Sequence, residues 1–254
     1  GLVGSEMCIR DSLKILHSLI LKKICCLMTF YKRNSETLRI QDFDTVLFDM
    51  DGTLLDLHFD NEFWLKNLVN DYALARGIRA CDAKTKLQKK MKAKEGTLDW
   101  YSTDYWSREL QLDVVNLKKK LCHLITERPG TIRFLEYLRK KKKNLFIVTN
   151  AHPDVINLKL EHVSIAKYID QIISSHTLDY PKESIYFWHR LFQNHLLCKQ
   201  KTLFMDDSIS ILRTAKLFGI KNIVHINSPD SQKPPKITNE FISINTFDEL
   251  QLTT

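Results

Sequence analysis

A short apolar run that ends in two alternating carboxylates is the feature that most constrains this chain. Residues 46–48 are Val-Leu-Phe, and Asp-Met-Asp-Gly-Thr follows at residues 49–53. The apolar run is typical of a buried strand, and Gly52 permits the tight turn that would end it. Asp49 and Asp51 can then project from this turn towards one ligand. Taken alone, the stretch fits a solvated Asp-Gly turn about equally well.

Two later strands are also predicted to end in polar residues. The apolar run at residues 145–148 precedes Thr-Asn at residues 149–150, and the run at residues 202–205 precedes Asp-Asp at residues 206–207. In an open α/β sheet, ligands bind outside the carboxyl ends of the strands. Together with Lys182, this edge would present carboxylates, a hydroxyl group and an ammonium group. Such a set predicts a site for a phosphate and a hard cation such as Mg²⁺.

Strand and helix patterns alternate through most of the chain, which predicts an α/β fold with a doubly wound parallel sheet and helices on both faces. Residues 59–127 differ, because apolar residues recur there at helical spacing and no strand pattern interrupts them. We therefore predict a helical cap domain at residues 59–127, inserted into an α/β core formed by residues 40–58 and 128–254.

The first 33 residues are predicted to be non-native or disordered. Residues 1–12 have no periodic pattern and resemble translated sequencing-adapter read-through. The two charge-free apolar runs, residues 15–21 and 24–31, are each too short to span a bilayer, and no small-x-small cleavage site follows them. We expect the native chain to start at Met28 and to have no membrane partner.

The distribution of charge bears on whether the protein binds nucleic acid, and the cysteine pattern bears on the compartment in which it works. The formal net charge is +8, but residues 1–33 hold six basic and two acidic residues, so half of the excess lies outside the predicted domains. A nucleic-acid partner is therefore not predicted. The six cysteines include no Cys-x-x-Cys pair, which favours a reduced, cytoplasmic protein. A monomer and a weak homo-oligomer are both compatible with the sequence.

Taken together, the strand-end residues resemble the motifs of the haloacid dehalogenase (HAD) superfamily of phosphatases. Residues 49–53 match its first motif, Thr149 its second, Lys182 its third and residues 206–207 its fourth. The resemblance runs from about residue 43 to residue 252. Further segments are similar to the GMP/IMP 5′-nucleotidases of that superfamily, namely residues 54–57, 98–101, 104–107, 150–153, 159–162 and 180–183.

The resemblance implies a HAD-like Rossmannoid core, a mobile cap and a Mg²⁺ cofactor, with Mn²⁺ or another divalent ion as the alternative. It also implies purine nucleoside 5′-monophosphates, GMP and IMP, as substrates. Other interpretations stay open. One is a phosphatase or phosphomutase for phosphoglycolate or a sugar phosphate. Another, from a different class, is a catalytically silent phosphate-binding module.

The resemblance also implies a role for each motif residue. Asp49 would attack the phosphate and carry it as an aspartyl-phosphate, while Asp51 would act as general acid and then as general base. Thr149 and Asn150 would bind the phosphoryl oxygens. Lys182 would neutralise charge on the phosphate and on the nucleophile. The implied metal ligands are Asp49, the backbone carbonyl of Asp51, Asp206 and Asp207.

The sequence departs from the family pattern around the third and fourth motifs, so the lysine and the metal ligands are assigned with alternatives. Lys159 is a rival for Lys182, but it lies ten residues past Thr149, within the next predicted helix, whereas the motif lysine of the family follows that helix. Many relatives have Pro after the motif lysine and a further Asp after the metal carboxylates, and here Glu183 and Ile211 stand in those places. Which of the two adjacent carboxylates of the fourth motif is the closer metal ligand stays open.

The residues that would recognise the nucleoside are less constrained by the sequence. Aromatic residues are concentrated in the predicted cap, and flat rings suit stacking on a purine base. Packing between helices is the commoner role for each of these rings. Polar residues just past the first and second motifs are further candidates for contacts with ribose or base. The candidate substrate contacts are His58, Asp60, Asn61, Trp64, Trp100, Tyr105 and His152.

Overall fold

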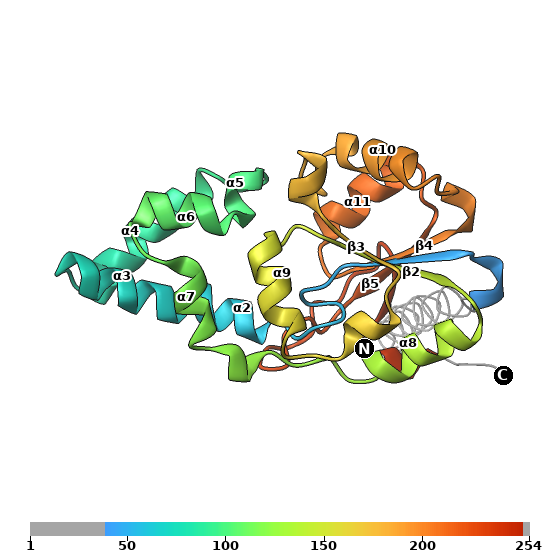
Figure 1. Ribbon diagram of the computed structural model, residues 1–254, viewed down its shortest axis with the longest axis horizontal. Helices are drawn as coiled ribbons and strands as arrows, with labels where there is room; N and C mark the ends of the chain where they lie inside the picture. The colour runs from blue at the N-terminus through green and yellow to red at the C-terminus, as the bar shows by residue number, and fades with distance from the viewer. Residues whose placement is uncertain (1–38, 251–254) are drawn as a thin grey trace, which may run out of the picture. The chain divides into compact units, whose positions relative to one another are not determined.

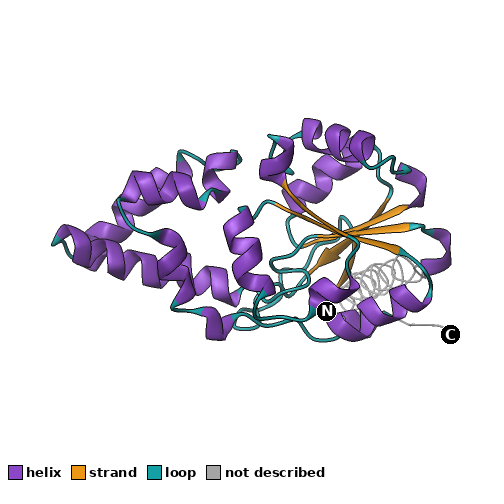
Figure 2. Cartoon of the chain, viewed as in Figure 1, coloured by secondary structure: helices purple, strands orange, loops and turns teal. Residues whose placement is uncertain are grey.

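The computed structural model describes residues 39–250, and the predictions for residues 1–33 lie outside this part. The core is a sheet, drawn in orange in Figure 2. It has six strands in the order β3-β2-β1-β4-β5-β6, and all neighbours are parallel. The predicted doubly wound parallel sheet is thereby confirmed. The strands are β1 (Thr45–Phe48), β2 (Asn144–Thr149), β3 (Gln171–Ser174), β4 (Thr202–Asp206), β5 (Asn222–Ile226) and β6 (Ile242–Ile244).

The strand order reverses between β1 and β4, and such a switch point is where open α/β sheets bind their ligands. In the register, Phe48 of β1 lies beside Ile147 of β2 and Met205 of β4. The residues at or just past the ends of these strands, Asp49, Thr149 and Asp206, therefore lie along one edge of the sheet. They are the polar residues from which the sequence predicts a site.

Helices cover both faces of the sheet. They are α8 (Thr131–Lys140), α9 (Pro153–Leu160), α10 (Ile185–Asn194) and α11 (Ile209–Phe218), with the short helices η1 (Ile40–Asp42), η4 (Ile165–Tyr168), η5 (Ser175–Leu178), η6 (Lys199–Lys201) and η7 (Phe247–Glu249). Successive strand residues point to opposite faces. Leu47 accordingly packs in one buried cluster with Trp188 of α10 and Leu212 of α11. Phe48 meets Phe134 of α8 edge-on on the other side, as the positions of these helices in Figure 1 show.

A helical insertion separates β1 from β2. Its elements are α2 (His58–Glu62), the π-helical turn η2 (Phe63–Asn67), α3 (Leu68–Arg76), α4 (Ala80–Lys92), α5 (Leu98–Tyr101), α6 (Thr103–Leu110), α7 (Val114–Lys119) and η3 (Cys122–Leu124). The insertion has a buried cluster of its own, which includes Leu87, Trp106 and Val114. In Figure 1, α3, α4 and α6 lie away from the sheet. That these helices form a separate, mobile cap domain stays a prediction.

One element begins later than the sequence predicts. Proline favours the first turn of a helix, so Pro181 predicts that the helix before β4 begins there. α10 instead begins at Ile185, where the Ser184 side chain caps it by accepting a hydrogen bond from the Tyr186 amide. Lys182 and Glu183 therefore lie on the turn before the helix. Among the helices of residues 39–250, none combines the length and the apolar character needed to cross a bilayer.

Candidate active site

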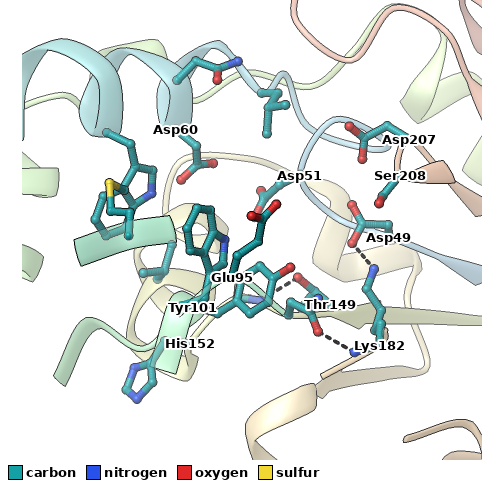
Figure 3. A pocket seen from close by; sticks show the side chains of 18 of the residues that line it. Asp49, Asp51, Asp60, Glu95, Tyr101, Thr149, His152, Lys182, Asp207 and Ser208 are labelled. Atoms are coloured by element: carbon teal, nitrogen blue, oxygen red, sulfur yellow. Dashed lines mark hydrogen bonds and ion pairs between the residues drawn. The ribbon is translucent and has the colours of Figure 1, made fainter. Parts of the chain in front are cut away.

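The polar strand-end residues line one cavity with a volume of about 620 Å³ (Figure 3). The carboxyl ends of β1, β2 and β4 form one wall, and residues of the helical insertion form the other. The structure brings all of the predicted catalytic, phosphate-binding and metal-binding residues to this cavity. They are Asp49, Asp51, Thr149, Asn150, Lys182, Asp206 and Asp207.

Lys182 is the cation at the centre of the site. Its side chain is 1% exposed, and its ammonium donates hydrogen bonds to Asp49 and, over 2.7 Å, to Asp206 Oδ2. Burial lowers the pKa of Lys182, but the charges of Asp206 and Asp49 outweigh it and raise the pKa above its ordinary value, so the lysine stays charged. Burial raises the pKa of Asp49 to about 7, although the ammonium of Lys182 acts in the opposite direction.

Three carboxylates at this edge could hold a cation. Ligand oxygens of Asp49, Asp206 and Asp207 all lie within 4.8 Å of one another. Desolvation, followed by the charges of Asp206 and Asp49, raises the pKa of Asp207 well above its ordinary value. Carboxylates this close together repel one another when they are ionised. A divalent cation bound between them would relieve this repulsion, and such ions prefer hard oxygen ligands.

The two carboxylates of the fourth motif differ in how they are used. Asp206 accepts hydrogen bonds from Lys182 and, over 2.7 Å, from the amide of Ser208. No hydrogen bond is found for the Asp207 carboxylate among residues 39–250. Gly52 explains how close the first motif comes to it, because a Cβ at Gly52 (φ +88°) would lie 2.8 Å from the Asp207 carboxyl carbon.

Asp51 belongs to a chain of alternating charges that reaches into the helical insertion. Its Oδ1 accepts a hydrogen bond of 2.6 Å from Lys159 Nζ, which also bonds Asp60. Asp60 in turn accepts a bond of 2.8 Å from Lys118, and both lysine side chains are only 2% exposed. Desolvation raises the pKa of Asp51 to about 6, opposed by Lys159. Lys159 thus contacts Asp51, whereas Lys182 contacts Asp49, the position expected of the motif lysine.

Asn150 and Glu183 connect the second motif to the turn that carries Lys182. Asn150 Oδ1 accepts a hydrogen bond of 2.9 Å from the Lys182 amide, and its Nδ2 donates one of 3.0 Å to Glu183. Tyr101 of α5 donates a further bond of 2.6 Å to Glu183. These contacts favour a positioning role for Asn150. Thr149 Oγ1 accepts from the Ala151 amide over 3.0 Å, so its own hydrogen can still be donated to a phosphate.

The candidate substrate contacts separate into two groups. Asp60, Asn61, Trp64, Trp100 and His152 line the cavity. His58 and Tyr105 are not among the lining residues, contrary to the prediction. The imidazole of His58 lies 3.6 Å from a carboxylate oxygen of Asp230 instead. Tyr105 packs edge-on against Trp106 within the insertion, with ring centroids 5.0 Å apart.

Several residues of the cavity were not singled out from the sequence. Lys118 stands first in a run of three lysines, a pattern that usually indicates a solvated helix end, and only the distant partner Asp60 explains its burial. Glu183 does not line the cavity itself, but it accepts hydrogen bonds from Asn150 and Tyr101, which do, and it stands where many relatives have proline. Glu95 follows α4 and lines the cavity, and nothing in its local sequence distinguishes it from a surface residue.

Comparison with known proteins places this geometry in context. Residues 46–225 match the family model described as haloacid dehalogenase-like hydrolase. The GMP/IMP nucleotidase YrfG of Escherichia coli (strain K12) is 39% identical over 210 residues, which cover 83% of this chain and 95% of that protein.

Solved structures share the fold. The HAD phosphatase from Thermococcus onnurineus is similar with a TM-score of 0.68 and 23% identity, over 82% of this chain and 96% of that one. CbbY from Rhodobacter sphaeroides, in complex with phosphate, gives a TM-score of 0.58 and 15% identity over the same shares. At these identities the likeness shows the fold alone.

Proposed function

Because the chain belongs to the haloacid dehalogenase-like hydrolase family, we propose that it is a divalent-metal-dependent phosphatase of purine nucleoside 5′-monophosphates, with GMP and IMP as substrates. The observation that carries the proposal is the contact of Lys182 with Asp49 beside the Asp206–Asp207 pair, in a cavity that Asp51 also lines. A carboxylate that can act as nucleophile, a cation and carboxylates that can hold a metal ion therefore lie together, which supports the proposal.

In the proposed reaction, a carboxylate oxygen of Asp49 attacks phosphorus and the bond from phosphorus to O5′ breaks, which leaves an aspartyl-phosphate. Asp51 gives its proton to the departing nucleoside oxygen. It then takes a proton from the water that attacks the phosphorus of the aspartyl-phosphate, and Asp49 is released with inorganic phosphate. Lys182 neutralises charge on the phosphoryl oxygens throughout, and Thr149 donates a hydrogen bond to them.

A divalent ion would supply the positive charge that lets one anion approach another. Asp49, Asp206, Asp207 and the backbone carbonyl of Asp51 would hold it. We propose Asp207 as the closer ligand of the two adjacent carboxylates, because Asp206 already accepts two hydrogen bonds from within the protein. Mg²⁺ is the expected ion, since it prefers carboxylate, phosphate and water oxygens.

Two observations support a preference for purine nucleotides: the similarity to a GMP/IMP nucleotidase and the aromatic residues that line the cavity. A nucleotidase of GMP and IMP that shares 39% of its residues covers 83% of this chain. Trp64 and Trp100 line the cavity on the side of the insertion, and flat rings stack on bases. A volume of about 620 Å³ is within the range of ligand pockets, and it can hold a nucleotide.

A panel of phosphomonoesters tests the proposed substrate. With Mg²⁺ present, we expect kcat/KM to be largest for GMP and IMP, at least about tenfold above UMP, phosphoglycolate and a hexose phosphate, since only a purine fills the aromatic wall. Initial rates of phosphate release measure this. Preferential hydrolysis of phosphoglycolate or the hexose phosphate would overturn the nucleotidase. Conversion of a sugar phosphate to its isomer without phosphate release would indicate a mutase.

Replacing Asp51 with Asn tests its role as acid and base. For GMP we expect kcat to fall about 10²- to 10⁴-fold, since the nucleoside oxygen is a poor leaving group and needs a proton. Nitrophenolate leaves without one, so p-nitrophenyl phosphate should give a burst of one nitrophenolate per active site, followed by slow turnover. Rapid mixing measures the burst. The double variant with Asp49→Asn is the control and should show none. A slow first turnover with both substrates would contradict this assignment.

A further inference from the structure

The residues that would bind the phosphate cannot distinguish one purine base from another. GMP and IMP share a hydrogen-bond donor at N1 and an acceptor at O6 of the purine. AMP has the reverse, an acceptor at N1 and an amino donor at C6. Aromatic stacking accepts any base, because every base has a π-face. A site that prefers GMP and IMP therefore needs an acceptor that faces N1, a donor that faces O6, or both. This step rests on the proposed function.

Most carboxylates that line the cavity are already engaged. Asp49, Asp206 and Asp207 form the candidate metal group at the strand ends, and Asp51 is bonded to Lys159. Asp60 accepts hydrogen bonds from two lysines that are nearly inaccessible to solvent, Lys118 and Lys159. The lysine charges outweigh the desolvation of Asp60 and lower its pKa to about 2. Both oxygens of Asp60 thus already accept a hydrogen bond from a charged lysine, and its charge is compensated within the protein.

Glu95 is the remaining carboxylate of the cavity lining. Glu95 lies on the turn that follows α4, and Figure 3 shows its side chain directed into the cavity. No hydrogen bond or ion pair of its carboxylate is found among residues 39–250. The residue is exposed, so water solvates the carboxylate until a ligand arrives. Its acceptor capacity is therefore available to a substrate.

The neighbours of Glu95 suit the rest of a purine. Trp100 and Met91, which come from the same part of the insertion, also line the cavity and offer apolar surface to the faces of a base. Lys92, on the last turn of α4, also lines the cavity and carries a donor of the kind that O6 would require. The candidate phosphate ligands come from the strand ends, whereas Glu95 and Lys92 come from the insertion. A nucleotide bound by its phosphate at those ends can extend its base towards this turn.

We propose that Glu95 is a specificity-determining residue that selects 6-oxopurine nucleotides. One carboxylate oxygen accepts a hydrogen bond from N1–H of guanine or hypoxanthine. The other accepts a hydrogen bond from the 2-amino group, which only guanine has. Adenine presents a lone pair at N1 and is repelled by the same carboxylate. Selection therefore comes both from attraction of the correct bases and from rejection of the wrong one.

The test compares kcat/KM for GMP, IMP and AMP in the wild type, Glu95→Ala and Glu95→Gln. A hydrogen bond from a charged group is worth about 10- to 100-fold, so Glu95→Ala should lose about that factor for GMP and IMP. The kcat/KM for AMP should stay within about threefold of the wild-type value or increase. Glu95→Gln keeps one acceptor but turns an amide donor towards the 2-amino group, so GMP should lose more than IMP. p-Nitrophenyl phosphate, which has no base, reports general damage to the cavity: a loss of its hydrolysis as large as the loss for GMP would overturn the inference.

The matched control is Glu109→Gln, which changes an exposed glutamate of α6 that pairs with Lys90 outside the cavity lining. It should leave the ratio of GMP to AMP unchanged. A wild type that prefers GMP and IMP, with the same ratio to AMP in both Glu95 variants, would overturn this inference and leave the proposed function intact. A wild type that hydrolyses all nucleotides equally would also overturn it. A wild type without nucleotidase activity would overturn the proposed function and the inference together.

Discussion

Asp49→Asn is expected to abolish phosphate release from every phosphomonoester, by a factor on the order of 10⁴ or more. An amide has no ionised oxygen to attack phosphorus, so the first step of the proposed reaction is lost. The folded state should persist, because Lys182 keeps its hydrogen bond of 2.7 Å to Asp206 and one carboxylate charge leaves a crowded acidic group. The measurements are single-turnover phosphate release from GMP and the thermal unfolding midpoint.

A matched control separates the loss of the nucleophile from the mere loss of an acid. Asp179→Asn removes the charge of a surface aspartate that pairs with Arg190 and has φ +60°, a conformation that Asn tolerates. This variant should retain wild-type rates. If Asp49→Asn kept more than about a tenth of the wild-type rate, the nucleophile assignment would fail. If the wild type itself released no phosphate, weight would move to a phosphate-binding module without catalysis.

The central part of the site could be predicted because its information is local in the sequence. Three apolar runs each end in polar residues, and parallel strands carry such ends to one edge. The register, which sets Phe48 beside Ile147 and Met205, confirms that the three runs are neighbours in the sheet. The choice of Lys182 over Lys159 also followed from chain order, and Lys182 contacts Asp49.

The parts that could not be predicted depend on contacts between distant residues. Lys118 looks like a solvated lysine until Asp60, 58 positions earlier, is placed against it. Helical spacing indicates that Tyr105 lies on a helix, but spacing alone does not say whether its ring faces the cavity or the packing of the insertion. His58 was predicted to contact the substrate because it is close in sequence to the first motif. Its imidazole instead lies beside Asp230, which is distant in the sequence.

Removal of divalent metal is expected to have an effect as large as the loss of the nucleophile. Without a cation, the negative charges of Asp49, Asp206 and Asp207 oppose one another and repel the phosphate. Binding of Mg²⁺ to the folded state should also raise the unfolding midpoint, in proportion to the logarithm of its concentration above Kd. Asp207→Asn should abolish this thermal shift. The shift is independent of activity, so it reports the metal site even for a variant that does not turn over.

The most direct test of the central claim is the initial rate of phosphate release from GMP by the unmutated protein, measured in excess Mg²⁺, after treatment with EDTA, and after Mg²⁺ is restored. The site predicts release in Mg²⁺, background rates in EDTA and recovery on readdition. Release that continues unchanged in EDTA would contradict the metal-dependent site, and no release in any of the three conditions would contradict the GMP phosphatase.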